Sequence, residues 1–275
     1  MITQQLAPTN AFENLLPNTL KPIYKLKIIG LIGSKLGHSF SQSYFQNKFE
    51  QLQIDDWKYL NFELASISEI EQLKADESVI GFNVTFPYKK EILPYLSTLS
   101  DTAKSAQAVN TVFIDADRQL HGFNTDVFGF LKSVKNWTGT SVENALILGT
   151  GGAAQAVRTA LDNLEINSAF VSRDPHFDLM YHEITREIVE NTQLIINCTP
   201  LGTFPNVSEM PDFPIDFLNE NHFVYDLVYN PEKSLFLTKA EQQGAKIKNG
   251  REMLELQAEK SWQIWTTLLA QSSLL

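Results

Sequence analysis

The first half of the chain alternates short apolar runs with segments of helical spacing. Residues 25–33 (KLKIIGLIG) form an apolar run that ends in glycine. Residues 39–53 then carry Phe45 and Phe49 at helical spacing, and residues 56–64 (DWKYLNFEL) return to a strand-like composition. This alternation predicts a strand, a helix and a second strand, which together form a βαβ unit.

A second unit of the same kind follows directly. Residues 66–76 predict a helix that Ser66 or Ser68 could cap, and residues 79–87 (VIGFNVTFP) predict another strand. Two consecutive crossovers of right-handed type predict a mostly parallel sheet that helices cover.

The next segments depart from this alternation of strands and helices. Residues 88–100 predict a helix that Pro94 kinks or shortens, because proline cannot donate the helical hydrogen bond. Residues 110–124 alternate polar and apolar positions around residues 115–118, which predicts a hairpin.

A second α/β region begins near residue 143. Residues 143–164 read as an apolar strand, a glycine turn and a long helix. Further strands are predicted at SAFVSR (168–173), QLIINCTP (193–200), FVYDLVY (223–229) and AKIKNG (245–250). These strands predict an open sheet separate from the first.

The last helix is predicted from about Arg251 to Leu269. Leu254, Ala258, Trp262 and Trp265 lie on one side of it. This apolar side predicts that the helix returns to pack on the first domain, with both tryptophans in the core.

The composition of the chain limits the kinds of molecule that it is expected to bind. The chain has 275 residues, 43% of them hydrophobic, with 22 Lys and Arg against 32 Asp and Glu, and therefore a net charge of −10. This balance, with no basic run, argues against nucleic acid. Cys198 is the single cysteine and is expected to pack as a small apolar residue. No Cys or His pair has metal-ligand spacing, so no metal is predicted, and the absence of a long apolar segment predicts a cytoplasmic protein.

The glycine turn fits a dinucleotide fingerprint. Gly149-Thr-Gly151-Gly152-Ala153-Ala154 matches G-x-G-x-x-A between a predicted strand and a helix. Gly149 would permit the tight turn, Gly151 would let a pyrophosphate approach, and the helix N-terminus favours its negative charge. The alternative is a glycine turn that serves only the fold.

The end of the next strand bears on the choice of nucleotide. Arg173 suits a 2′-phosphate, which favours NADP, whereas Asp174 could repel that phosphate or bind a free ribose hydroxyl. The alternative is that both are solvated loop charges.

Four polar clusters fall where predicted strands end. They occupy residues 38–41 (HSFS), 83–89 (NVTFPYK), 109–111 (VNT) and 122–126 (GFNTD). Ligands of open α/β sheets bind beyond the carboxyl ends of strands, so these clusters predict one site for a polyhydroxylated molecule. His38 is expected only to fill a turn. On spacing alone, Lys89 and Asp126 could also form a solvated surface ion pair.

Eight short motifs occur in a characteristic order. They are Ser39-Phe-Ser41, Asn83-Val-Thr85-Phe-Pro87-Tyr-Lys89, Val109-Asn110-Thr111, Asn124-Thr125-Asp126, Gly149-Thr-Gly151-Gly152-Ala153, Asn197-Cys-Thr199-Pro200-Leu-Gly202, Tyr225-Asp226-Leu-Val-Tyr229-Asn230-Pro231 and Gly250-Arg-Glu-Met253-Leu254-Glu-Leu-Gln257. With these motifs the chain resembles the shikimate dehydrogenase family from about Lys27 to Trp265.

The resemblance implies reversible, NADP-dependent reduction of 3-dehydroshikimate to shikimate. It implies that Lys89 and Asp126 flank the reacting carbon and that Ser39 and Ser41 hold the substrate carboxylate. The residues it implies at the ring hydroxyls or in the walls of their pocket are Asn83, Thr85, Asn110, Tyr229 and Gln257. It implies nicotinamide contacts from Leu227 and the Gly250 backbone. The other residues it implies at the cofactor are Gly149, Gly151, Gly152, Ala153, Ser172, Arg173 and Thr199.

Two departures from the family pattern stand out. Gln42 replaces a common proline, which is expected to affect only the start of the helix. The usual adenosine signature, Asn-Arg-Thr with a later basic residue, is here Ser172-Arg173-Asp174 with Phe177. We therefore expect NADP with reduced discrimination against NAD.

These features predict an α/β protein of two domains with the active site between them. Residues 23–124 with 251–275 would form the substrate-binding domain, and residues 125–250 a Rossmann-like NADP-binding domain. Residues 1–22 are expected to be a flexible extension, and the protein a monomer or homodimer. The alternatives are an NAD-linked quinate/shikimate dehydrogenase and a non-catalytic shikimate or NADP sensor; a folate-linked dehydrogenase would have no evident use for the two serines.

Overall fold

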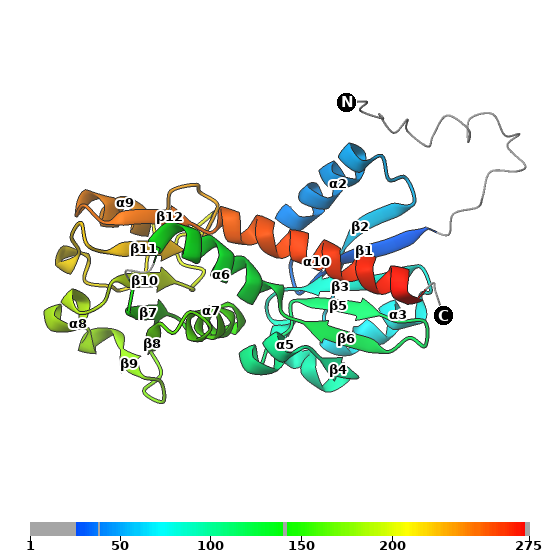
Figure 1. The fold of residues 1–275 in the computed structure, drawn as a ribbon, viewed down its shortest axis with the longest axis horizontal. Coiled ribbons are helices and arrows are strands. Elements are labelled where there is room, and N and C mark those ends of the chain that lie inside the picture. The colour runs from blue at the N-terminus through cyan, green and yellow to red at the C-terminus, as the bar shows by residue number, and fades with distance from the viewer. Residues whose placement is uncertain (1–25, 38, 140–141, 273–275) are drawn as a thin grey trace, which may run out of the picture.

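The computed structural model describes residues 26–37, 39–139 and 142–272. The predicted extension and His38 lie outside these ranges. Two sheets lie end to end in an elongated molecule, and helix α10 (Arg251–Ser272) runs from one to the other (Figure 1). Within these ranges, none of the helices has the length and apolar character needed to cross a membrane.

The first sheet has six strands in the order β2-β1-β3-β5-β6-β4. Its strands are β1 (Lys27–Gly33), β2 (Trp57–Glu63), β3 (Val79–Val84), β4 (Thr98–Leu99), β5 (Thr111–Ile114) and β6 (Leu120–Phe123). Its helical elements are α2 (Phe40–Leu52), η1 (Ile67–Glu69), α3 (Ile70–Ala75), α4 (Tyr88–Glu91), η2 (Leu93–Tyr95) and α5 (Asp101–Ala106). Strand β1 pairs in parallel with β2 and β3, while β5 and β6 form the predicted antiparallel hairpin.

The helix predicted over residues 88–100 is interrupted as expected. Helix α4 ends at Glu91, and Pro94 lies in the separate 3₁₀ turn η2. The prediction missed β4, a two-residue edge strand that pairs with β6. A strand this short carries too few residues to show an alternating pattern.

The second sheet is parallel throughout, in the order β12-β11-β10-β7-β8-β9. Its strands are β7 (Asn144–Leu148), β8 (Asn167–Ser172), β9 (Leu179–Met180), β10 (Leu194–Asn197), β11 (Phe223–Asp226) and β12 (Lys246–Asn249). Its helical elements are α6 (Thr125–Thr138), α7 (Gly152–Asp162), η3 (Tyr181–Glu183), α8 (Arg186–Glu190), η4 (Ile215–Phe217) and α9 (Leu235–Gln242). The chain leaves β7 on one side to form β8 and returns on the other to form β10, so a topological switch point lies at β7. The predicted two-domain α/β class with a Rossmann-like second sheet is confirmed.

Helix α10 connects the two cores. Near its start, Met253 packs in the core that covers one face of the second sheet. Further along, Ala258 and Trp265 pack with Phe45 against the first sheet. The Trp265 side chain is fully buried, and its Nε1 donates to the Val112 carbonyl at 2.8 Å. The predicted return of this helix to the first domain is therefore correct, and Trp265 is a core residue.

Helices α6 and α10 cross closely because α6 carries Gly129 at the contact. A Cβ atom added to Gly129 would lie 2.6 Å from the Met253 carbonyl oxygen and 3.2 Å from Gln257 Cβ. Real carbon atoms do not approach carbonyl oxygens this closely, so a larger residue must push the helices apart.

We expect Gly129→Ala to lower the free energy of unfolding by about 1–3 kcal/mol, as overpacking of a buried contact does. Urea denaturation measures this loss. Gly151→Ala is the matched control, because a Cβ there meets no atom within 4 Å. Equal stability of Gly129→Ala and the control would show that the helices can separate without cost.

Candidate active site

The carboxyl ends of strands from both sheets meet at the junction. Lys89 lies in α4, just after β3, and Gly152 opens α7, just after β7. A Cβ at Gly152 would lie 3.2 Å from Lys89 Cβ and 3.8 Å from Ala108 Cβ. The predicted nucleotide turn of the second sheet therefore contacts the polar cluster of the first.

Lys89 and Asp126 form an ion pair at this junction. Lys89 Nζ donates to Asp126 Oδ2 at 2.7 Å, and the two side chains are 20% and 8% exposed. Asp126 Oδ1 accepts a second hydrogen bond, from Asn110 Nδ2 at 2.9 Å. The pair is largely shielded from water, so the alternative of a solvated surface ion pair is wrong.

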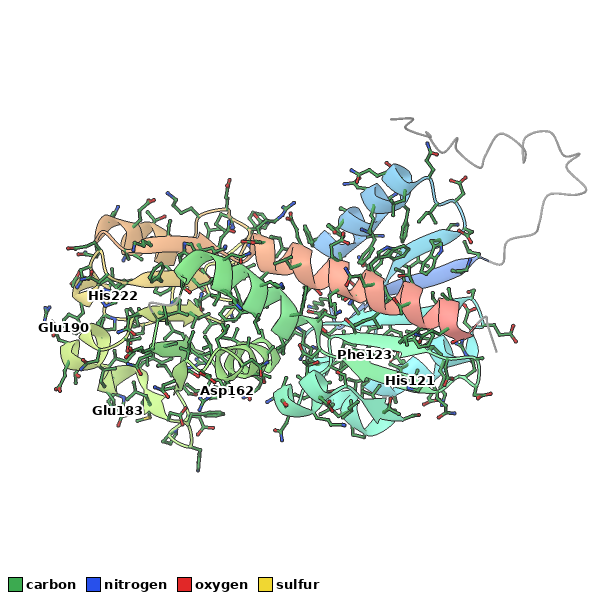
Figure 2. The ribbon with its side chains drawn as sticks, viewed as in Figure 1. His121, Phe123, Asp162, Glu183, Glu190 and His222 are labelled. Atoms are coloured by element: carbon green, nitrogen blue, oxygen red, sulfur yellow. The ribbon has the colours of Figure 1, made fainter. Side chains whose placement is uncertain are left out.

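His121 and His222 form their hydrogen bonds away from this junction. His121 lies on the first sheet and His222 at the outer part of the second (Figure 2). His121 bonds Asp115 and Thr98, and His222 Nε2 lies 3.0 Å from the Val189 carbonyl. Neither ring is bonded to Lys89 or Asp126.

Asn110 organises the polar residues around the ion pair. Its Oδ1 accepts from the Thr125 backbone N–H at 2.7 Å, and its Nδ2 donates to Thr125 Oγ1 at 2.9 Å. Gln257 reaches the same group from α10, with its Oε1 3.4 Å from Asn110 Nδ2. Residues distant in the sequence thus surround Asp126 with fixed dipoles.

A second layer of hydrogen bonds lies behind this group. Asn83 Oδ1 accepts from Tyr59 Oη at 2.9 Å, and Asn83 Nδ2 lies 3.1 Å from Ser261 Oγ. Ser261 is fully buried and also bonds Thr111 Oγ1 at 2.8 Å. The prediction missed Tyr59 and Ser261, since neither belongs to a motif; the only signal for Ser261 is its position four residues after Gln257 on the same helix.

The two predicted substrate serines lie at the start of α2. Ser39 is the N-cap: its Oγ accepts from the Gln42 backbone N–H at 3.2 Å and donates to Asn61 Oδ1 at 3.0 Å. Ser41 is buried and bonds the hydroxyl of Tyr59, whose pKa burial raises. Gln42 Oε1 accepts from Asn61 Nδ2, so the replacement of proline leaves the start of the helix intact.

A hollow of about 510 Å³ opens between α2 and α10. Ser39 and Tyr229 are the predicted site residues that line it, together with Phe40, Tyr44, Arg251 and Glu259. The Arg251 guanidinium lies 4.8 Å from the centre of the Phe40 ring, and the Phe40 and Tyr229 rings meet at 5.9 Å. Burial raises the pKa of Tyr229, and the nearby Arg251 charge offsets part of that rise.

The glycine turn has the conformation that the fingerprint requires. Gly149 has φ of +104°, a region that favours glycine, and its N–H donates to the Val171 carbonyl at 2.9 Å. Gly151 is the N-cap of α7 in extended conformation, and a Cβ there would meet open space. The turn thus leaves room above the helix N-terminus for an anionic group.

The predicted adenosine side differs from a doubly basic site. Ser172 ends β8, and its Oγ accepts from the Asp174 backbone N–H at 3.0 Å. Hydrogen bonds from the backbone and ring of His176 lower the pKa of the exposed Asp174 carboxyl. Phe177 packs edge-on against Phe170 at 6.0 Å, so the position of the family's second basic residue is occupied by an apolar side chain.

Three loops of the second sheet are tied together beside the glycine turn. Asp226, at the end of β11, is fully buried; its Oδ1 accepts from Asn197 Nδ2 at 2.9 Å, and its Oδ2 accepts from Ser234 Oγ at 2.5 Å. Leu227 N–H donates to the Asn197 carbonyl at 2.9 Å. A Cβ on Gly250 would lie 2.2 Å from the Leu227 carbonyl oxygen, so that position must be glycine.

Comparisons with known proteins agree with this geometry. Residues 31–112 match the family model described as the shikimate dehydrogenase substrate binding domain. The curated shikimate dehydrogenase (NADP(+)) of Caldicellulosiruptor saccharolyticus is 35% identical, and the alignment covers 91% of this chain and 96% of that protein. The chain belongs to the shikimate dehydrogenase family. The resemblance seen in the sequence is therefore confirmed.

Solved structures of this family share the fold. The Thermus thermophilus enzyme in complex with NADP(H) and shikimate aligns with a TM-score of 0.77 at 28% identity, over 88% of this chain and 94% of that one. The Listeria monocytogenes enzyme in complex with shikimate and NAD aligns with a TM-score of 0.75 at 29% identity, over 88% and 92%.

The structure brings five of the predicted site residues of this shikimate dehydrogenase family member together at the junction. Lys89, Asp126, Asn110 and Gln257 form one hydrogen-bonded group, and Asn83 lies directly behind it. By contrast, Arg173 directly follows β8, which β10 and β7 separate from β11, and its charge lies near Tyr181. Their roles toward ligands remain predictions.

The buried Asp226 predicts a specific pH dependence of stability. Burial raises the pKa of its carboxyl from an ordinary 3.8 to about 6, against the opposing effect of its hydrogen bonds. The folded protein therefore binds this proton more tightly than the unfolded chain, and its contribution to the free energy of unfolding falls as pH rises from about 4 to about 7.

We expect Asp226→Asn to remove up to about 3 kcal/mol of this fall, because the amide does not titrate. Chemical denaturation of both proteins across the pH range measures the difference between their free energies of unfolding. The contributions of the other titrating groups are the same in both proteins and cancel in this difference. Parallel stability curves for the two proteins would contradict the assignment.

Proposed function

We propose that this chain catalyses the reversible NADP-linked reduction of 3-dehydroshikimate to shikimate, a step of chorismate and aromatic amino-acid biosynthesis. The observation that carries the proposal is the shielded Lys89–Asp126 ion pair, which contacts a dinucleotide-type glycine turn. An acid beside a cofactor site is what reduction of a ketone requires.

The residues of the second sheet fit NADP. The open space at Gly151 suits a pyrophosphate at the N-terminus of α7, and Arg173 suits the 2′-phosphate. Other residues proposed to hold the cofactor are Gly149, Gly152, Ala153, Ser172, Thr199, Leu227 and Gly250. When bound, NADP supplies the hydride, and the chain's own residues position the substrate and move the proton.

Lys89 is proposed as the general acid. Reduction of a ketone builds negative charge on its oxygen, which a nearby ammonium stabilises and then protonates. Asp126 holds the ammonium in place through the 2.7 Å hydrogen bond and is held in turn by Asn110. In the reverse direction the neutral lysine accepts the hydroxyl proton.

The first sheet is proposed to bind the substrate. Ser39 and Ser41 would take the carboxylate at the start of α2, while Thr85, Tyr229 and Gln257 would face the ring hydroxyls. Asn83 and Asn110 already bond protein groups on both ends of their amides, which supports a role in shaping the pocket wall.

The domain division after residues 124 and 250 is part of the proposal. It is supported by the separate cores of the two sheets, although α10 touches both. The cytoplasmic location and the monomer or homodimer state remain predictions from the sequence.

Initial rates test the proposal against its rivals. Shikimate and quinate are each oxidised with NADP and with NAD, and NAD(P)H formation is followed. We expect turnover with shikimate and NADP, and more use of NAD than a strictly NADP-specific site would allow, because Phe177 replaces a basic contact. Preference for NAD or quinate would favour the quinate/shikimate enzyme, and shikimate binding without turnover would favour the sensor.

Removing either member of the ion pair should abolish most of the activity. Lys89→Met keeps the length of the side chain without its proton, and Asp126→Asn keeps the shape without the charge. We expect each to lower kcat at least about a hundredfold, as loss of acid–base catalysis predicts. Calorimetry should show shikimate binding within about threefold of wild type, since neither change empties the pocket. Full activity of folded Lys89→Met would refute its role.

Substitutions of two adjacent glycines should change different kinetic constants. A Cβ at Gly151 enters the space assigned to the pyrophosphate, so Gly151→Ala should raise KM for NADP at least about tenfold at little cost to kcat. A Cβ at Gly152 presses on the stem of Lys89 at 3.2–3.3 Å, so Gly152→Ala should lower kcat about tenfold. Identical kinetic changes in the two variants would contradict this division.

A further inference from the structure

One buried charge of the second sheet has no part in the proton transfer assigned to Lys89 and Asp126. Asp226 ends β11 and is 0% exposed, yet three donors converge on it: Asn197 Nδ2, Val228 N–H at 3.0 Å and Ser234 Oγ. These donors come from three separate points of the chain, so the carboxylate joins the loops that follow β10 and β11 (Figure 1).

The first branch of this network leads to Thr199. A carboxylate can only accept, so Asn197 must turn its NH₂ toward Asp226 and its amide oxygen away. That oxygen accepts from Thr199 N–H at 2.9 Å and from Thr199 Oγ1 at 2.6 Å. The orientation of the Asn197 amide, and with it the place of Thr199, is therefore fixed by Asp226.

The second branch holds the turn that carries Leu227. Val228 N–H and Ser234 Oγ both donate hydrogen bonds to the Asp226 carboxylate. Gly250 N–H in turn donates to the Val228 carbonyl at 3.3 Å. The backbone of Leu227 is pressed against Gly250. Thr199, Leu227 and Gly250 thus form one rigid wall built on a single carboxylate.

We propose that Asp226 is a positioning residue for the nicotinamide half of the cofactor, which it serves by fixing Leu227 through Val228 and Ser234 and, through the Val228 carbonyl, Gly250. The inference rests on the proposed function. The pyrophosphate is assigned to the glycine turn and the 2′-phosphate of the adenosine half to Arg173, and none of the hydrogen bonds described for Asp226 reaches those residues. Loss of Asp226 should therefore weaken one half of the site only.

Two ligands distinguish binding at the nicotinamide half of the cofactor site from binding at the adenosine half. NADP⁺ and adenosine 2′,5′-bisphosphate, which lacks the nicotinamide half, are titrated into each protein by calorimetry. For Asp226→Ala we expect the Kd of NADP⁺ to rise about tenfold, as the loss of about 1.4 kcal/mol predicts, while that of the bisphosphate stays within about twofold.

Conservative and control variants complete the set. In Asp226→Asn the amide oxygen can accept from Asn197 and Val228 while its NH₂ donates to Ser234 Oγ, so NADP⁺ should bind within about threefold of wild type. Tyr225→Phe removes a neighbouring buried hydroxyl that bonds Ser133, and it should change neither Kd.

The outcomes are distinct. The inference is overturned if Asp226→Ala raises the Kd of NADP⁺ and of the bisphosphate equally, or raises neither. If that variant does not fold, Ser234→Ala decides: a selective loss of NADP⁺ affinity of about threefold supports the inference, and wild-type affinity for both probes overturns it. Failure of the wild-type protein itself to bind NADP⁺ would instead refute the proposed function.

Discussion

The ion pair between Lys89 and Asp126 is the interaction on which the site depends. Two charges removed from water are costly unless further groups bond them. Here Asn110 bonds the carboxylate, and Asp126 stands in the first turn of α6, where the helix dipole favours an acid. The pair therefore keeps the Lys89 ammonium, proposed as the proton donor, fixed at the junction of the two sheets, beside the turn assigned to the cofactor.

The C-terminal helix determines whether that junction keeps its geometry. Helix α10 packs on both cores, brings Gln257 to the ion pair and anchors it through Ser261 in the first sheet. Its close crossing with α6 at Gly129 sets the distance between Gln257 and Asp126. The hydrogen-bonded group around Lys89 and Asp126 is consequently assembled from α4, α6, α10 and the residue before β5.

Local patterns in the sequence predicted the parts of the site that lie at the ends of strands. Lys89 and Gly151 each follow a parallel strand, so each could be assigned to the carboxyl edge of its own sheet without coordinates. Asn110 instead precedes β5, which runs antiparallel to β3 and therefore starts at the same edge. Partners that meet across long separations left no such pattern. Asn83 and Ser261 are 178 residues apart, and their contact follows from how α10 packs. Short edge strands such as β4 and β9 were missed because two residues carry no period.

A double-mutant cycle on kcat for shikimate oxidation tests the central claim most directly, that Lys89 and Asp126 act as one unit. Lys89→Met, Asp126→Asn and the double variant are compared with wild type under saturating NADP. Because Asp126 is proposed to act through Lys89, the kcat of the double variant should be no more than about tenfold below the kcat of the less active single variant. Losses that multiply in the double variant would show that the two residues act independently and would contradict the account.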